Sequence, residues 1–184
     1  MGWEERLLDL FDDLEQQAEG LALADRDAEV AERSRAEYAQ VDLASRLHAS
    51  VGRTLVIGVA GVGQLDATVL RAGRGWCLVR ARDHEWVLRL ASFTYLRGLS
   101  VRAVAEPARP VTARLGLGSV LRGLAGEGTV VVVHRLDGSL GRGRLLRVGG
   151  DFLELAVEDS VLAGGREAWV EVVPFGQVAA IRQT

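Results

Sequence analysis

Apolar residues near the start of the chain recur at spacings of three, four and seven positions. The stripe consists of Trp3, Leu7, Leu10, Leu14 and Leu21, with polar Gln17 at the position that the pattern skips. Such spacing places the side chains on one side of a helix and is typical of a coiled-coil seam. A second helical pattern covers residues 22–50, and Gly20 is a candidate break between the two.

Residues 1–42 are therefore expected to form an acidic helical arm. One form is a helix or helical hairpin packed on its own domain. The other is a coiled coil that binds a second copy of the chain or another partner. Residues 28–47 are rich in alanine and offer little apolar cover, which favours self-association through residues 1–24 and a homodimer.

After residue 50 the pattern changes to short apolar segments separated by glycine turns, and it occurs twice. Residues 52–81 match residues 127–157 at a separation of 75 positions, which becomes 76 after one inserted residue, and residues 85–93 match residues 168–176. The chain is thus predicted to contain a duplicated unit of about 60 residues. On this alignment four large aromatic residues take equivalent strand positions and are expected to pack in the core: Trp76, Trp86, Trp169 and Phe152.

Each unit predicts a short helix followed by five strands. Asp137-Gly138 marks a hairpin, because this pair readily adopts the positive φ angles that such turns need. Gly143 lies inside the following strand and predicts a bend. Two of the three prolines lie within residues 105–114, which reads as a linker. The expected organisation is an arm (1–42), a first unit (43–105), a linker (106–116) and a second unit (117–184).

Six residues of the second unit follow a known motif in order: Asp137, Gly138, Gly143, Leu145, Asp151 and Leu155. This pattern resembles the first motif of the Sm-like branch of the SH3-like small barrels, and the resemblance covers roughly residues 43–184, counted as two copies. It implies a mainly β fold with some α structure, in which a helical arm precedes two repeated five-stranded Sm-like barrels. Glu154 stands where the family has its RNA-contacting asparagine, and Pro174-Phe175 and Ala91-Ser92 stand where it has an Arg-Gly pair. The family's RNA pocket is therefore not implied.

The glycine-rich stretch "GVAGVG", residues 58–63, poses a separate question, since glycine loops can hold phosphates. A phosphate loop needs a helix after it, whose free N–H groups point at the ligand. The residues that follow, "QLDATVLRA", are suited to a strand. The stretch aligns with the end of a strand and its turn in the second unit, so it is predicted to be a hairpin turn.

Charge divides the chain into two parts. Residues 1–50 carry five arginines against thirteen acidic residues, whereas residues 51–184 carry seventeen against twelve. All 22 basic residues are arginine, a usage typical of GC-rich genomes, and the whole chain resembles proteins of GC-rich actinobacteria, which implies no activity. Cys77 is the only cysteine and the N-terminus is acidic. Neither a disulfide nor a secretory leader is indicated, and a cytoplasmic location is expected.

No constellation of catalytic residues emerges from the sequence. The three histidines, His48, His84 and His134, are scattered, without a cysteine or another histidine at ligand spacing. Cys77 lies in an apolar strand, where a thiol is usually part of the core. The chain is therefore expected to be no enzyme and to bind no cofactor or metal.

The arginines are the polar residues that bear on function. Arg142 and Arg144 share one face of a strand with Arg147 on the other, and Arg71 and Arg74 occupy the corresponding end of the first unit. They could bind phosphates of RNA or DNA, so nucleic-acid binding is the alternative function. The favoured function is a non-enzymatic scaffold that binds a protein partner, because small barrels expose sheet edges that pair with a partner strand.

Overall fold

The computed structural model describes residues 2–158 and 168–184, and within them every side chain except those of residues 4–13, 18, 158 and 168. The chain divides into two compact units, residues 1–41 and residues 42–184. The first unit is helical and the second is mainly β, as the change in sequence pattern predicts.

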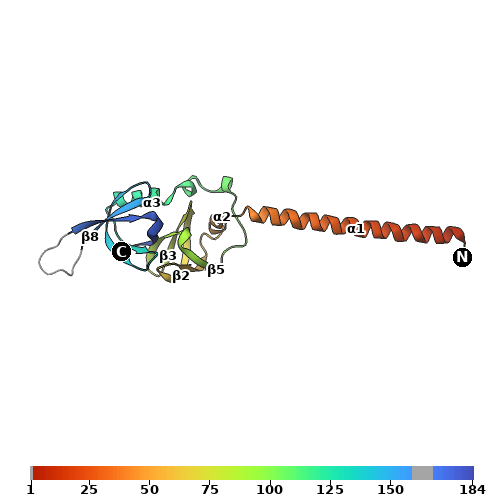
Figure 1. Cartoon of the computed structure of the whole chain (residues 1–184), viewed down its shortest axis with the longest axis horizontal. Helices are drawn as coiled ribbons and strands as arrows, with labels where there is room; N and C mark the ends of the chain where they lie inside the picture. The colour runs from red at the N-terminus through yellow and green to blue at the C-terminus, as the bar shows by residue number, and fades with distance from the viewer. Residues whose placement is uncertain (1, 159–167) are drawn as a thin grey trace. The chain divides into compact units, whose positions relative to one another are not determined.

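The first unit is one uninterrupted helix, α1 (Trp3–Ala39) (Figure 1). Gly20 does not break it, so of the two expected alternatives, a helix or a helical hairpin, the arm forms the single helix. The sequence after Gly20 is rich in alanine, glutamate and arginine, which favour helix strongly enough to absorb the roughly 1 kcal/mol cost of one glycine. None of the helices in the described part of the chain is long and apolar enough to cross a membrane.

The β unit repeats one order of elements. Its first half contains α2 (Leu43–His48), β1 (Thr54–Val59), β2 (Gly63–Gly73), β3 (Trp76–Ala81), β4 (His84–Arg89), the 3-10 turn η1 (Leu90–Ser92) and β5 (Phe93–Arg97). Its second half contains α3 (Leu117–Gly126), β6 (Val130–Arg135), β7 (Leu140–Val148), β8 (Phe152–Glu158), β9 (Ala168–Pro174), η4 (Phe175–Gln177) and β10 (Val178–Gln183). Between the halves, the predicted linker forms two 3-10 turns, η2 (Glu106–Ala108) and η3 (Val111–Arg114).

The ten strands form a single antiparallel sheet in the order β5-β1-β2-β3-β4-β10-β6-β7-β8-β9. Within each half the fifth strand lies beside the first, followed by the second, third and fourth. The halves are joined where β4 pairs with β10. Among the described strands β5 and β9 each have one neighbour, so the sheet is open at both ends. The expected helical arm followed by a mainly β repeat is confirmed, whereas closure of each half into a barrel is not among the described strand pairings.

The pairing register shows how closely the halves repeat. Val69 opposes Val79 in the first half, and Leu145 opposes Leu155 in the second, each residue 76 positions after its counterpart. A bulge follows at the same place in both pairs of strands. The fifth strands, β5 and β10, repeat at a separation of 85 positions. Leu96 of β5 opposes Ile57 of β1, and Ile181 of β10 opposes the equivalent Val133 of β6. The repeat is thus in one register through three strands, and the β8–β9 hairpin is nine residues longer than the β3–β4 hairpin, which is the difference between 76 and 85.

This register corrects two details of the sequence alignment. The separation is 76 from β1 onward, because Leu55 opposes Ala67 as Val131 opposes Gly143. In β9 the counterpart of Trp86 is Glu171, since these two residues oppose the equivalent Val79 and Leu155.

The four aromatic residues that were expected to pack in the core differ in their burial. Trp76 and Trp86 are buried and Phe152 is partly buried, but Trp169 is 45% exposed, so its expected role as a packing anchor is wrong. The sequence alignment matched Trp169 with Trp86 because it was displaced by two positions from the pairing register.

Two hydrophobic cores lie in the β unit, and each contains residues of both halves. The first core is built mainly from β1 to β4 and includes Ala179 and Ala180 of β10. The second core is built mainly from α3 and β6 to β10 and includes Trp76 and Val87 of the first half. The β4–β10 junction is therefore part of the hydrophobic interior on both sides of the sheet.

The stretch "GVAGVG" forms the end of β1 and the turn into β2, so the prediction of a hairpin turn is confirmed. Gly61 has φ +72°, and a Cβ at this position would overlap the carbonyl oxygen of Arg135. The glycine therefore allows the first hairpin of one half to contact the first hairpin of the other. Asp137-Gly138 also forms its predicted turn, with φ +85° at Gly138.

Replacing Gly61 with alanine should destabilise the β unit by roughly 2–4 kcal/mol, because the positive φ and the overlap with Arg135 both add cost. Gly63→Ala is the matched control: its φ is +97°, but a Cβ there meets no atom within 4 Å. It should cost only the roughly 1–2 kcal/mol of the positive φ, without the cost of an overlap. Urea denaturation of both variants measures the difference, and equal losses would show that the contact between the hairpins does not matter.

Candidate functional site

The β4–β10 junction shows how this chain joins two sheet edges. Three antiparallel residue pairs make the junction: Trp86 with Arg182, Val87 with Ile181, and Leu88 with Ala180. Val87 is only 6% exposed and Ile181 only 1%. Pairing here satisfies backbone groups and buries side chains on both faces of the strands, which is the combination that stabilises a sheet.

Polar contacts add to this junction from both sides. The guanidinium of Arg89 donates to the carbonyl oxygen of Gly176 at 3.0 Å, and the buried Ser92 hydroxyl donates to the carbonyl oxygen of Ala179 at 2.9 Å. The indole N–H of Trp76 donates to the carbonyl oxygen of Leu115 at 2.7 Å, which ties the linker to β3. The two halves are thus held by directional bonds as well as by apolar burial.

Three side chains meet at the junction, those of Trp86, His134 and Arg182. The rings of Trp86 and His134 have centroids 5.0 Å apart, and the Arg182 guanidinium carbon lies 5.7 Å from the Trp86 ring centroid. Trp86 Nε1, His134 Nε2 and Arg182 Nε are buried without a hydrogen-bond partner among the described residues. Burial, followed by the positive charge of Arg182, lowers the pKa of His134 from its ordinary value. Neutral His134 therefore favours the folded junction.

The open edges of the sheet differ in character. Along β9, Trp169 and Val170 are exposed, and Val172 is 56% exposed. Along β5, Tyr95 and Arg97 are exposed while Leu96 is partly buried, and the Arg97 guanidinium carbon lies 5.1 Å from the centroid of the Tyr95 ring. An exposed edge strand with apolar side chains readily pairs with another strand. The sequence did not indicate that these residues lie at open edges, and it placed Trp169 in the core, because only the pairing register shows which strands lie at the edges.

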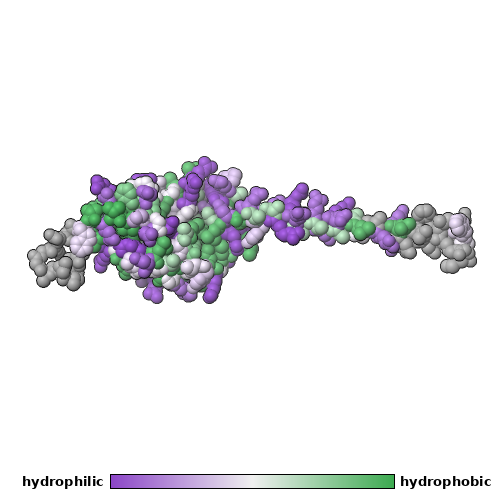
Figure 2. All heavy atoms as spheres, viewed as in Figure 1, coloured by the Kyte–Doolittle hydropathy of each residue, from purple (hydrophilic) through white to green (hydrophobic). Residues whose placement is uncertain are grey.

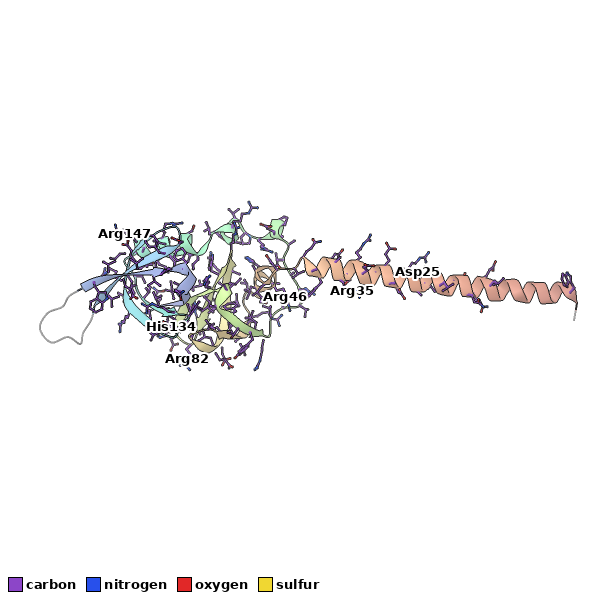
Figure 3. The ribbon with its side chains drawn as sticks, viewed as in Figure 1. Asp25, Arg35, Arg46, Arg82, His134 and Arg147 are labelled. Carbon is purple, nitrogen blue, oxygen red and sulfur yellow. The ribbon has the colours of Figure 1, made fainter. Side chains whose placement is uncertain are left out.

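The arginines predicted to bind phosphate or a partner do not all have free side chains. Arg142 and Arg144 lie on the exposed face of β7, as expected from their spacing. Arg147 lies beyond the bulge and its Nε donates to Glu154 at 2.7 Å. Figure 3 shows Arg147 well away from His134 on the β unit. Arg147 is highly exposed, so this ion pair contributes little stability.

The first-half arginines line two separate pockets. Arg74 lines a cavity of about 420 Å³ together with Glu106 and Arg109. In the same cavity Asp42 accepts from the Ser45 backbone N–H at 2.6 Å and from Arg109 at 3.1 Å. Burial raises the pKa of Asp42, but these hydrogen bonds and the charge of Arg109 outweigh it and leave the pKa below its ordinary value. This carboxylate caps α2, so the cavity has a structural role at its acidic side.

Arg71 lies at a mainly apolar pocket of about 540 Å³ that also includes Trp76 and Leu115. Its counterpart in the second half is Arg147, whose partner Glu154 corresponds to Leu78 in the first half. The two halves therefore share the arginine, but only the second half has an acidic residue opposite it.

The apolar stripe of the arm is open to solvent at every position whose side chain the structure describes. Trp3, Leu14 and Leu21 are exposed, at 74%, 51% and 69%. Leu7 and Leu10 belong to α1, but their side chains lie outside the described residues. Green apolar atoms lie among purple polar ones along the described part of α1 (Figure 2). The described members of the predicted stripe are thus exposed side chains of one helix.

The described residues show no cluster of histidine, cysteine, aspartate or glutamate that could hold a metal ion. Burial raises the pKa of the Cys77 thiol to about 12, so this cysteine stays protonated at neutral pH. Comparisons with protein families, curated proteins and solved structures found no match to the chain. The surfaces described above therefore carry the functional argument.

Between pH 7 and pH 5 the free energy of unfolding should fall. His134 has a lowered pKa in the folded chain, so unfolding takes up a proton once the pH is below the ordinary value of 6.5. Its stabilisation is complete above that pH and is lost as the pH falls. His134→Phe keeps a ring against Trp86 and should flatten this dependence, which urea denaturation at several pH values measures. An unchanged slope would show that His134 does not titrate differently on folding.

Proposed function

We propose that this chain is a non-enzymatic protein-interaction module, working in the cytoplasm, that self-associates through α1 and presents the open edges of its β unit to protein. The observation that most supports this proposal is the exposed apolar stripe of α1. Burying a large apolar side chain is worth roughly 1.5–3 kcal/mol. A helix that leaves several of them in water gains considerably from a second helix laid along the stripe.

The stripe continues as a heptad pattern beyond the residues first singled out. Counting onward from Leu21 in alternating steps of three and four leads to Ala24, Ala28, Ala31, Arg35 and Tyr38, all exposed, so Arg35 is the one charged residue among these positions. Small alanines at seam positions let two helices approach closely, and large residues at both ends fix their alignment. The pattern therefore supports a helix of this same chain as the partner of α1.

For the β unit we propose that each five-stranded half is an Sm-like small barrel. The strand order of the halves and the short helix before each of them support this. So does the ion pair between Arg135 of β6 and Glu171 of β9, which links the first and fourth strands of the second half across its inner side. Such a bent half presents its fourth and fifth strands as edges for a partner strand.

Nucleic-acid binding is the alternative, and one observation favours it. Arg142 and Arg144 are exposed and make no hydrogen bond or ion pair with the part of the chain that the structure describes. The acidic arm, with thirteen acidic residues in the first 50 positions, opposes attraction to a polyanion. Salt-dependent binding of labelled RNA or DNA that disappears in Arg142→Ala/Arg144→Ala would establish this alternative.

Replacing Leu14 and Leu21 with glutamate should lower the weight-average mass of the full chain, because two charges then lie in the seam. The matched control is Leu23→Glu/Val30→Glu, which makes the same kind of change at exposed positions off the seam and should leave the mass near that of the parent chain. Sedimentation equilibrium over a concentration series measures both. A parent chain that is monomeric at high micromolar concentration would contradict self-association through α1.

A further inference from the structure

The mainly apolar pocket of about 540 Å³ lies in the β unit, and both halves and the linker contribute to its walls. β2 contributes Leu70 and Arg71, the linker contributes Pro110 and Thr112, and α3 contributes Val120. Pockets of roughly 300–1,000 Å³ with mostly apolar walls and a few polar groups are typical of small-molecule sites. We propose that this pocket binds a small organic carboxylate with an apolar body, and that Arg71 holds the carboxylate group.

The walls of the pocket combine open apolar surface with a fixed aromatic ring. Val51 and Leu115 both line the pocket, yet Val51 is 48% exposed and Leu115 is 45% exposed. Trp76 is buried, and the bond from its indole N–H to the carbonyl oxygen of Leu115 holds the ring against the linker. A wall that is already ordered costs little conformational entropy when a ligand binds. An apolar ligand body is therefore stabilised by covering this surface.

Arg71 supplies the charge of the pocket. Its side chain is exposed and makes no hydrogen bond or ion pair with the part of the chain that the structure describes. Among the described residues that line the pocket, none is acidic. A guanidinium presents a planar fork of N–H donors that matches the two oxygens of a carboxylate. The pocket is therefore complementary to a molecule with an apolar body and one negative end.

Comparison of the two halves shows what the first half lacks at this position. Arg147, the counterpart of Arg71, opposes Glu154 across β7 and β8 and donates to its carboxylate at 2.7 Å. Arg71 opposes Leu78 across β2 and β3. A bound carboxylate thus supplies to Arg71 the acidic partner that Arg147 has within its own chain.

The two other polar residues of the pocket add no second charge. Burial, followed by the positive charge of Arg109, lowers the pKa of His48 against the smaller opposing effect of Asp42, so this imidazole is mostly neutral at pH 7. Thr112 contributes an uncharged hydroxyl. One guanidinium matches the single charge of a carboxylate better than the −1.5 to −2 charge of a phosphate group at about pH 7.

A ligand in this pocket contacts both halves of the β unit and the linker between them. Because it binds the folded chain and not the unfolded one, it should raise the melting temperature of the β unit. The described lining residues include none of α1. This proposal therefore does not depend on the proposed self-association.

Titration calorimetry of the full chain with octanoate and with phenylpropionate tests the site. We expect saturable binding of at least one of these carboxylates, together with a rise in melting temperature. Two further probes share the octyl chain but lack the carboxylate: 1-octanol should bind more weakly than octanoate, and octylammonium more weakly still. No saturable binding of either carboxylate up to about 10 mM, or equal binding of octanoate and octylammonium, would overturn the proposal.

Variants of Arg71 assign the binding to this pocket. Arg71→Leu removes the charge and should weaken binding of the carboxylate roughly tenfold or more. Leu78→Glu supplies an acidic partner within the chain and should weaken it in the same direction. Arg144→Leu is the matched control, since Arg144 is an exposed arginine that does not line the pocket, and it should leave the affinity unchanged. Thermal melting verifies that each variant is folded.

Nuclear magnetic resonance locates the bound carboxylate. The indole N–H resonance of Trp76 should shift on titration, whereas that of Trp169, which does not line the pocket, should stay in place. Full affinity in folded Arg71→Leu, or an equal loss in Arg144→Leu, would show that the carboxylate binds elsewhere. The Leu14→Glu/Leu21→Glu background should bind the carboxylate as the parent chain does, so failure of this site and failure of self-association are seen separately.

Discussion

The pairing of β4 with β10 is the contact on which the β unit depends. It unites two five-stranded halves into one sheet, and it supplies residues of each half to the core of the other. Without β10, the apolar side chain of Val87 would lose its cover, and the ring of Trp86 would lose the guanidinium that lies over it. The halves therefore cannot be independent domains in the energetic sense, although the chain encodes them as two copies of one pattern.

Much of this architecture could be predicted from local pattern, because alternating apolar residues and turn glycines act within a few positions of each other. The hairpins at Gly61 and Gly138 were predictable on that basis. The alignment of Trp169 with Trp86 failed because it was based on residue identity. Equivalent positions in the sheet are instead defined by which residues oppose each other across paired strands. Nine extra residues before β9 allow a shift that the letters alone do not reveal. Edge position is also invisible in the sequence, since it depends on which strands meet across the whole unit.

For the candidate surfaces too, features set by residues close in sequence could be predicted, and features set by residues far apart in sequence could not. The stripe of α1 was predictable, because residues on one side of a helix are close in sequence. Arg71 and Arg147 stand at equivalent places in the two repeats, but only Arg147 has an acidic residue opposite it. The same position in the pattern therefore has a different environment in each half. Sequence spacing identified the arginines, whereas the cross-strand neighbours that decide their chemistry come from the fold.

Duplication followed by edge pairing leaves a specific problem of symmetry. Joining two identical units head to tail satisfies one edge of each and leaves the other two open, however well the first pair fits. Natural sheets protect such edges with charge, proline or a bulge. Here β9 ends at Pro174, which has no N–H to donate, but its middle carries exposed valines, and β5 has a bulge against β1 on its inner side only. An edge that has kept apolar residues where protection is usual is an edge suited to a partner strand.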